Sequence, residues 1–383
     1  MQGKYTSWTR FAVAYAFRQW TRAQVRGLVT WPKDVPPEGG CTALVGMCHL
    51  LPGVLIGNLR CLNQSAWPEL KEVIVVVDST RGCLPSELEA QARAVCSNFR
   101  LRFEYYSQKQ AQRSEEVRLP YVFSWLSWSI GISLCRTKHA LLHDYDALIL
   151  DDTLARRYDK FVADRSFVQG IKWYKGNGVE TSDQLATTFE AFFDVAWVRA
   201  FQPVAMFNQV AYWAGRSFDY DTLLDIQHRS TARDKRSLEP MPESSMVHPS
   251  QMIHQFTMFR RDPAKLQPCF SIPMIPFFEW LSGNAEALKD ATQRLKNRAG
   301  TMTDFFGNNV PINLGMLSRE NVDWDLKQMI RACQGLDISP SRDLYNYGNE
   351  LYALCGAADA AWVGDFTTQQ RDWIDRSLAA GPA

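Results

Sequence analysis

Two aspartates stand two positions apart at the end of an apolar run, in the segment His-Ala-Leu-Leu-His-Asp-Tyr-Asp at residues 139–146. Mg²⁺ in phosphate sites is usually held by one or two protein carboxylates together with phosphate oxygens of the substrate. Asp144 and Asp146 are therefore candidate ligands of a divalent metal. The chemistry that they suggest is the binding of a diphosphate-bearing substrate, such as a nucleoside diphosphate.

The elements that would position these aspartates alternate along the first 150 residues. Strand-like apolar runs occupy residues 42–48, 72–78, 101–106 and 140–143, and helix-like segments occupy 52–62, 86–97 and 120–135. The run at 72–78 is β-branched and uninterrupted, as in a parallel sheet covered on both faces. The pattern predicts an α/β fold with a doubly wound, mostly parallel, Rossmann-like sheet and right-handed crossovers.

Several polar or reactive side chains fall where these runs end. Asp78 ends the second run, and Asp144 and Asp146 follow the fourth. Cys48 and His49 take the corresponding place after the first run and are further candidate substrate-binding residues. Because ligands of such sheets bind beyond the carboxyl ends of the strands, we expect these side chains to share one binding edge.

Composition narrows the class of protein. Hydrophobic residues make up 46% of the 383 residues, which provides a sizeable core and argues against global disorder. Lys and Arg total 42 against 41 Asp and Glu. This balance argues against a nucleic-acid partner, because neutralising phosphates requires a concentrated positive surface.

The nine cysteines include no Cys-x-x-Cys pair. An odd, scattered set is typical of reduced thiols and predicts a cytoplasmic location rather than a disulfide framework. No apolar run approaches the roughly 20 residues that span a bilayer. The apolar segment 11–17 is short and lacks a cleavage site of small residues, so we predict no signal peptide.

The N-terminal segment is basic and aromatic. Before the first acid, Asp34, it holds Lys4, Arg10, Arg18, Arg22, Arg26 and Lys33. A helix of this kind could contact an anionic membrane surface. However, Trp8, Phe11 and Tyr15 continue the arginine stripe, so the apolar and basic faces are not opposed. We therefore expect residues 1–33 to form a helix packed on the body, with solvated arginines, rather than a peripheral membrane contact.

The run Val-Val-Val-Asp at 75–78, the long spacer and the Asp-Tyr-Asp at 144–146 resemble the nucleotide-sugar half of glycosyltransferases of fold type A, family 2 in particular. The resemblance covers about residues 41–255. It implies that Asp78 contacts the nucleobase of a UDP- or GDP-sugar donor and that Asp144 and Asp146 meet the metal, Mn²⁺ or Mg²⁺, and the ribose-diphosphate. Cys48 and His49 are then donor-site residues.

The same resemblance implies further roles downstream. The segment Phe-Asp-Tyr-Asp-Thr-Leu-Leu at 218–224 is similar to the family's acid pair before a Leu-containing helix, and it places Asp221 as the catalytic base. Tyr220 stands where the family usually has Glu. His248 matches a downstream histidine that approaches the metal. Removal of a proton from an acceptor hydroxyl by Asp221 would assist direct attack on the sugar, which inverts the anomeric centre. A retaining mechanism stays open, because the sequence does not fix the separation of the base and the leaving group.

The chain is predicted to have four functional segments. Residues 1–40 form the N-terminal helix and a Pro- and Gly-rich linker, and residues 41–150 the nucleotide-sugar-binding half. Residues 151–283 form the acceptor-binding half, which takes a carbohydrate or another hydroxyl compound and contains a polar loop at 229–242. Residues 284–383 form a helical C-terminal extension.

Two alternatives remain open at this stage. A haloacid dehalogenase-like phosphohydrolase also carries Asp-x-Asp after a strand, with the first Asp as nucleophile. Here no Gly-Thr follows, and the strand is fourth rather than first. The second alternative is a non-catalytic nucleotide-binding protein on the same fold, which would bind a donor without transferring its sugar.

Overall fold

The computed structural model describes residues 1–32, 36–261, 271–297, 318–355 and 367–379. The chain forms two compact units. The first comprises residues 1–49, 66–145 and 152–242, and the second comprises residues 50–65, 146–151 and 243–383. The four functional segments predicted from the sequence stay a prediction.

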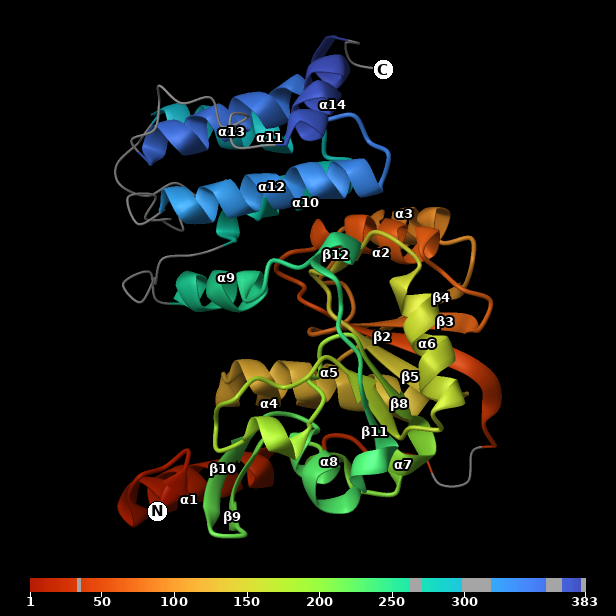
Figure 1. Ribbon diagram of the computed structural model, residues 1–383, viewed down its shortest axis with the longest axis vertical. Coiled ribbons are helices and arrows are strands. Elements are labelled where there is room, and N and C mark those ends of the chain that lie inside the picture. Colours follow the sequence, from red (N-terminus) through yellow and green to blue (C-terminus); the bar gives the residue numbers. More distant parts are fainter. Residues whose placement is uncertain (33–35, 262–270, 298–317, 356–366, 380–383) are drawn as a thin grey trace. The chain divides into compact units, whose positions relative to one another are not determined.

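A seven-stranded sheet forms the centre of the first unit (Figure 1). Its strands in sheet order are β11 (Arg236–Leu238), β7 (Val168–Gly170), β8 (Ala191–Asp194), β5 (Thr137–His143), β2 (Glu38–Met47), β3 (Leu70–Val77) and β4 (Arg100–Tyr105). Strands β5, β2, β3 and β4 run parallel, and β8 runs antiparallel to its neighbours β5 and β7. The predicted α/β fold with a mainly parallel sheet is confirmed.

The strand order reverses between β2 and β5. The chain proceeds from β2 to β3 to β4 in one direction and then places β5 on the other side of β2. The crevice beyond the carboxyl ends at such a switch point is where open α/β sheets bind ligands. The register pairs Val45 with His143 and Met47 with Val77. The residues that follow β2, β3 and β5 therefore lie at one edge of the sheet.

Helices flank this sheet within the first unit. They are α1 (Trp8–Val25), α3 (Leu88–Val95), α4 (Gln108–Val117), α5 (Pro120–Leu134), α6 (Thr153–Ala163), α7 (Val195–Arg199) and α8 (Leu224–Ser230). Helix α5 packs on β2 and β3. Glycines allow this close approach, because a Cβ added to Gly131 would lie 3.0 Å from a Leu44 methyl carbon. Trp125 and Leu126 of α5 are fully buried in the resulting core.

Smaller elements complete the first unit. A three-stranded sheet has the order β1 (Gln2–Gly3), β10 (Arg216–Tyr220) and β9 (Gln209–Trp213), with β10 antiparallel to β9. Short 3₁₀ turns are η1 (Thr181–Asp183), η2 (Pro203–Ala205) and η3 (Arg233–Lys235).

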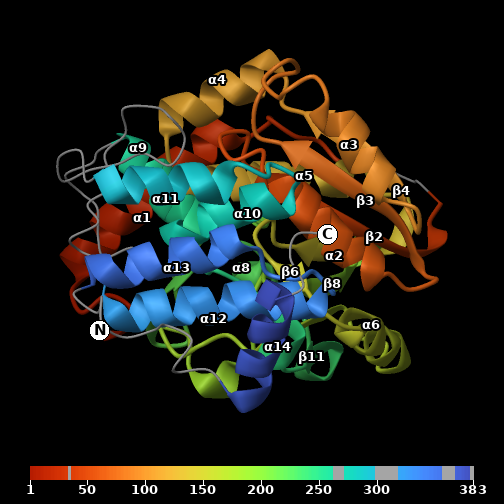
Figure 2. The same ribbon diagram turned by 90° about the horizontal axis from the view of Figure 1, so that it is seen from above.

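The second unit is mainly helical. Its helices are α2 (Val54–Gln64), α9 (Met252–Arg261), α10 (Ile275–Leu281), α11 (Ala287–Asn297), α12 (Arg319–Gly335), α13 (Arg342–Leu354) and α14 (Thr368–Ala379), with 3₁₀ turns η4 (Glu243–Ser245) and η6 (Ile272–Met274). Helices α11 and α13 lie side by side, with α12 next to α13 (Figure 2). The predicted helical C-terminal extension is confirmed over the described residues. Within them, no helix combines the length and the apolar character needed to cross a bilayer.

One hairpin-like pair in the second unit matters for the site. Strand β6 (Leu148–Ile149) pairs antiparallel with β12 (Met246–Val247), although about 100 residues separate them in the chain. The N–H of Leu150 extends this pairing by donating to the carbonyl oxygen of Ser245 at 2.8 Å. Asn58 of α2 donates to the carbonyl oxygen of Ala147 at 2.7 Å, which holds the start of β6.

Two expectations about secondary structure are corrected, and one helix was not predicted. Strand β2 begins at Glu38, inside the expected linker, because the N–H of Glu38 pairs with the carbonyl oxygen of Arg136 at 2.8 Å. The segment 229–242 is not a plain loop, since β11 lies in it and joins β7. Helix α4 was not predicted from its polar sequence. It begins with a capping box between Ser107 and Gln110, which satisfies backbone groups that the first turn leaves unpaired.

Candidate active site

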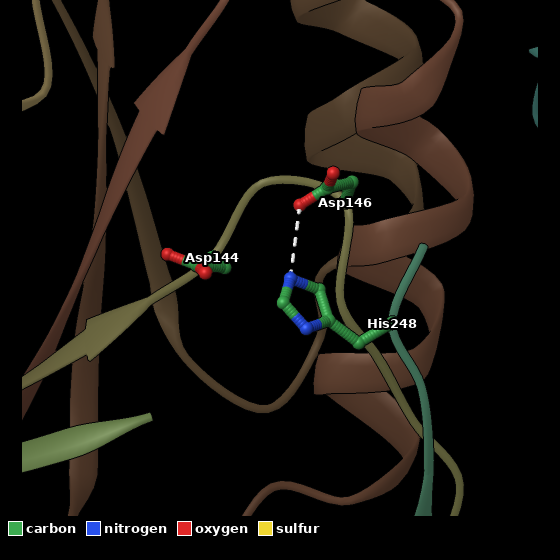
Figure 3. Close-up of side chains that lie close together, drawn as sticks. All are labelled: Asp144, Asp146 and His248. Atoms are coloured by element: carbon green, nitrogen blue, oxygen red, sulfur yellow. Dashed lines mark ion pairs between the residues drawn. The ribbon is translucent and has the colours of Figure 1, made fainter. Parts of the chain in front are cut away.

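The turn after β5 carries the two aspartates that drew attention in the sequence. Figure 3 shows their carboxylates near the imidazole of His248. Oδ1 of Asp146 lies 3.6 Å from Nε2 of His248, and one donor atom from each of Asp144, Asp146 and His248 lies within 4.8 Å of the other two. Asp146 is only 6% exposed, whereas Asp144 and His248 are half-buried. We call these three residues the Asp-Asp-His cluster.

Backbone pairing explains why a histidine so distant in the chain reaches the aspartates. The register of β6 and β12 places Val247 opposite Leu148. His248 follows Val247 directly, and Asp146 stands two residues before Leu148. In an antiparallel pair the two continuations remain neighbours, so His248 is brought next to Asp146.

A buried carboxylate supports the turn from behind. Glu190 is fully buried, and its Oε1 and Oε2 lie 2.9 and 3.0 Å from Nδ1 of His143. The N–H of Asp144 donates to the same Oε1 at 3.2 Å. Glu190 has a left-handed backbone with φ of 44°, a conformation that is costly for a non-glycine residue and is retained where surrounding contacts fix it. These contacts hold the end of β5 and the start of the turn in place.

The donor set of the cluster fits a divalent cation. Two carboxylates and one imidazole are common protein ligands of such ions, and oxygen ligands suit Mg²⁺ and Mn²⁺. Ligands on opposite sides of an ion at about 2.1 Å stand about 4.2 Å apart. A cluster whose donor atoms lie within 4.8 Å of one another therefore needs only a small contraction to hold one ion and to leave positions for phosphate oxygens.

The other predicted donor-site residues lie at the ends of β2 and β3. The N–H and the Nδ1 of His49 lie 2.8 and 2.6 Å from Oδ1 of Asp78. The N–H of Asp78 donates to the carbonyl oxygen of Met47 at 3.0 Å. Cys48 is buried at 5% exposure. Strand β2 separates the ends of β3 and β5, so Asp78 and Asp144 lie about 10 Å apart across the sheet, two strand spacings.

Asp221, the predicted base, follows β10 in the three-stranded sheet. Its Oδ1 accepts hydrogen bonds from Nδ2 of Asn208 and from the N–H of Thr222, both at 2.8 Å. Within the described part of the chain no hydrogen bond reaches Oδ2. Burial raises the pKa of Asp221, against the lowering effect of the Thr222 and Asn208 hydrogen bonds and of the Arg18 charge. A carboxylate with a raised pKa and an unused oxygen suits proton abstraction.

The structure thus brings together only part of the predicted site. Asp144, Asp146 and His248 lie close together, and Asp78 with His49 lies on the same sheet edge as Asp144. Asp221 forms its hydrogen bonds with Asn208 and Thr222 rather than with any of these residues. Three sets of roles stay predictions: metal binding by Asp144, Asp146 and His248, donor binding by Asp78, Cys48, His49 and Asp144, and the base role of Asp221.

Glu190 is the supporting residue that sequence analysis missed. Its only signal in the sequence is an acid within the aromatic run Phe189-Glu190-Ala191-Phe192-Phe193. A charged residue at such a position is almost never fully buried unless it is paired. The sequence pattern therefore indicates that Glu190 has a partner. It does not identify His143 and the N–H of Asp144 as the partners.

We expect Glu190→Gln to weaken Mn²⁺ binding about 10- to 100-fold, the usual cost of losing a group that supports a metal ligand. The physical reason is the loss of the charged acceptor that fixes the backbone of Asp144. Titration of the folded variant with Mn²⁺, followed by electron paramagnetic resonance, measures the change. Glu239→Gln is the matched control, because Glu239 pairs with Lys160 at 3.4 Å. Equal Mn²⁺ affinity of the Glu190 variant and the wild type would remove Glu190 from the site.

Comparison with known proteins finds only solved structures of low sequence identity. No protein family and no curated protein matches the chain. S. aureus TarS 1-349 is 13% identical, with 88% of this chain and 90% of that chain covered and a TM-score of 0.35. The mannosyltransferase PcManGT from Pyrobaculum calidifontis, in complex with GDP-Man and Mn²⁺, is 15% identical, with 85% and 96% covered and a TM-score of 0.30. The mannosyltransferase Ktr4p from S. cerevisiae, in complex with GDP, is 9% identical, with 52% and 70% covered and a TM-score of 0.29. Identities and TM-scores this low do not assign a function to this chain, so we infer its function from its own site.

Proposed function

We propose that this protein is a metal-dependent glycosyltransferase of fold type A, similar to family 2, which moves a sugar from a nucleoside-diphosphate donor to an acceptor hydroxyl. One observation carries the proposal: the Asp-Asp-His cluster stands at the carboxyl end of β5, next to the switch point of a mainly parallel sheet. A phosphate-bearing ligand is expected at this place in the fold. The scattered cysteines, which include no Cys-x-x-Cys pair, favour the cytoplasm as its compartment.

The donor would lie along the edge formed by the ends of β3, β2 and β5. In this arrangement Asp78, held by His49, contacts the nucleobase, and the Asp-Asp-His cluster lies at the diphosphate. A divalent cation held there, Mn²⁺ or Mg²⁺, supplies Lewis-acid stabilisation of the charge that develops on the departing diphosphate. Asp144 and His248 are half-buried and less buried than Asp146, so a substrate reaches them first.

The acceptor reacts by a single displacement. The anomeric carbon loses its bond to the diphosphate oxygen, which keeps the electron pair, while a new bond forms to the acceptor oxygen. Oδ2 of Asp221 takes the proton of the acceptor hydroxyl. Attack from the face opposite the leaving group inverts the anomeric configuration, and NMR of the product tests this by its anomeric coupling constant.

The donor site is tested by thermal unfolding with UDP or GDP, each with and without Mn²⁺. A ligand that binds only the native state at 100 times its Kd stabilises that state by about 2.7 kcal/mol. We expect at least one nucleotide to raise Tm by a few degrees with Mn²⁺, and we expect EDTA to remove the shift. If neither nucleotide shifts Tm under any of these conditions, the donor-site proposal fails.

Two readouts separate this proposal from the alternatives. A phosphohydrolase with Asp144 as nucleophile would release phosphate from a simple phosphate ester, and Asp144→Asn would stop that release. A non-catalytic binder would show the Tm shift but neither hydrolysis nor transfer of the sugar with a panel of hydroxyl acceptors. Release of the nucleoside diphosphate that depends on an added acceptor supports the transferase alone.

A further inference from the structure

Helix α1 is fixed to the first unit by its basic side chains. Nη2 of Arg18 lies 3.0 Å from Oδ1 of Asp219, and the Arg18 guanidinium lies 4.8 Å from the centroid of the Tyr121 ring. Nη1 of Arg22 donates to the carbonyl oxygen of Phe207 at 3.0 Å. Arg18 is 9% exposed. The expectation that these arginines are solvated is therefore wrong for Arg18 and Arg22, because they bind acceptors on the body.

The inward arginines leave an apolar face of α1 in solvent. Val13, Phe17 and Trp20 follow one another by four and three residues and so share one side of the helix. Their exposed fractions are 66%, 48% and 51%. The rings of Phe17 and Trp20 stack with centroids 5.9 Å apart, and Trp8 near the start of the helix is 60% exposed. Trp8 belongs to a different side, because its ring centroid lies 4.8 Å from that of Tyr212 on β9, so we call Val13, Phe17 and Trp20 the outer face of α1.

This face is held outward rather than merely exposed by chance. Turning α1 about its axis would bury the outer face only by removing Arg18 from Asp219, which leaves that half-buried carboxylate without its cation. Removing one partner of a largely desolvated ion pair costs stability. Helix α1 also packs on β9 and α4 through its other side (Figure 1). Large apolar side chains gathered on one exposed surface mark interaction sites.

The charges around the outer face are positive. Arg10, one turn before Val13, and Arg26, at the C-terminal end of α1, are exposed, and the first acid in the sequence is Asp34. Aromatic side chains with flanking Lys or Arg have the composition of a helix that lies in the plane of a membrane surface. Each basic residue near an anionic bilayer adds attraction that salt weakens.

We propose that the outer face of α1 binds the surface of a bilayer that contains anionic lipid, with α1 lying parallel to that surface. The aromatic and aliphatic side chains enter the boundary between headgroups and acyl chains, and Arg10 and Arg26 contact the headgroups. The sequence argued against membrane binding because arginines share a stripe with aromatic residues. In the structure Arg18 and Arg22 of that stripe bind acceptors elsewhere in the first unit, so they do not lie on the outer face. The proposal does not depend on the reaction that the protein catalyses.

The test is sedimentation of the full chain with two kinds of vesicle. One kind contains phosphatidylcholine alone, and the other also contains 30% phosphatidylglycerol, about one anionic lipid in three, which gives the vesicle a negative surface. We expect wild type to sediment with the anionic vesicles and to be released in part by high salt. Phe17→Glu and Trp20→Glu should each lower the partition coefficient about tenfold or more, because each removes a large apolar group from the interface.

The matched control is Val162→Glu, since Val162 is a hydrophobic residue of α6 that is 45% exposed in the same unit. The control should partition like wild type, and the nucleotide-induced Tm shift should be the same in all the variants. Wild type that stays in the supernatant with both vesicle types overturns the proposal. An equal loss of binding in Val162→Glu overturns it as well. If wild type does not bind vesicles, and light scattering shows a wild-type dimer that Phe17→Glu dissociates, the outer face binds a second copy of the chain instead.

Discussion

Replacing Asp146 by alanine is expected to abolish metal-dependent binding of the nucleotide donor. Asp146 is the most buried member of the Asp-Asp-His cluster and lies 3.6 Å from His248. Loss of a ligand should exceed the 10- to 100-fold cost of losing a residue that only supports one, so we expect donor affinity with Mn²⁺ to fall about 100-fold or more. Isothermal titration with UDP or GDP in the presence of Mn²⁺ measures the change.

The comparison with Asp152→Ala makes this test specific. Asp152 stands six residues further on, and its side chain is 68% exposed. Both variants remove one negative charge from the same stretch of chain, but only Asp146 belongs to the cluster. The Asp152 variant should bind the nucleotide as wild type does. Donor affinity that survives in Asp146→Ala and still depends on Mn²⁺ would show that the metal binds elsewhere.

The parallel sheet could be predicted because its strands carry their own signal. The run at 72–78 is a continuous β-branched segment, and β3 occupies Leu70–Val77. A strand buried on both faces has to be apolar throughout, so local sequence and tertiary position agree. The carboxyl ends of parallel strands then lie on one edge by topology alone, which is why Asp78 and Asp144 could be assigned to a common edge before the structure.

Contacts between segments far apart in the chain could not be predicted from local sequence patterns. His248 reaches Asp146 through a β6–β12 pair of two residues each, too short to leave a periodic signal. The same holds for Glu190, whose partners come from β5. A resemblance indicated His248 as a candidate, whereas nothing local indicated Glu190.

The prediction that the arginines of the N-terminal helix are solvated failed for a different reason. Helical spacing shows which residues share a face, but it does not show which face meets the body. Arg18 faces inward because β10 offers Asp219 as a partner at 3.0 Å. A rule that places arginine in solvent gives the wrong orientation wherever the fold provides a half-buried carboxylate or a carbonyl acceptor, as it does for Arg18 and Arg22.

Asp221→Asn is expected to leave donor affinity almost unchanged and to lower the rate of sugar transfer by 10²- to 10⁴-fold, the usual contribution of a positioned general base. Asparagine keeps the shape of the side chain and an oxygen for the N–H of Thr222. It cannot take up the proton of the acceptor hydroxyl. The decisive measurement is kcat with saturating donor and acceptor, beside the donor Kd. Asp225→Asn is the matched control, because Asp225 lies in the following helix and pairs with Arg229 at 2.7 Å.

The pH dependence of transfer gives an independent check on Asp221. Burial raises the pKa of this carboxyl, and only the ionised form can act as a base. Transfer should therefore be full at pH values above the raised pKa and should fall as pH decreases through it, at a higher pH than an exposed aspartate near 3.9 would give. This acidic limb should vanish from the residual activity of Asp221→Asn and persist in Asp225→Asn. An unchanged acidic limb in Asp221→Asn would assign the base to another residue, because the titrating group would still be present.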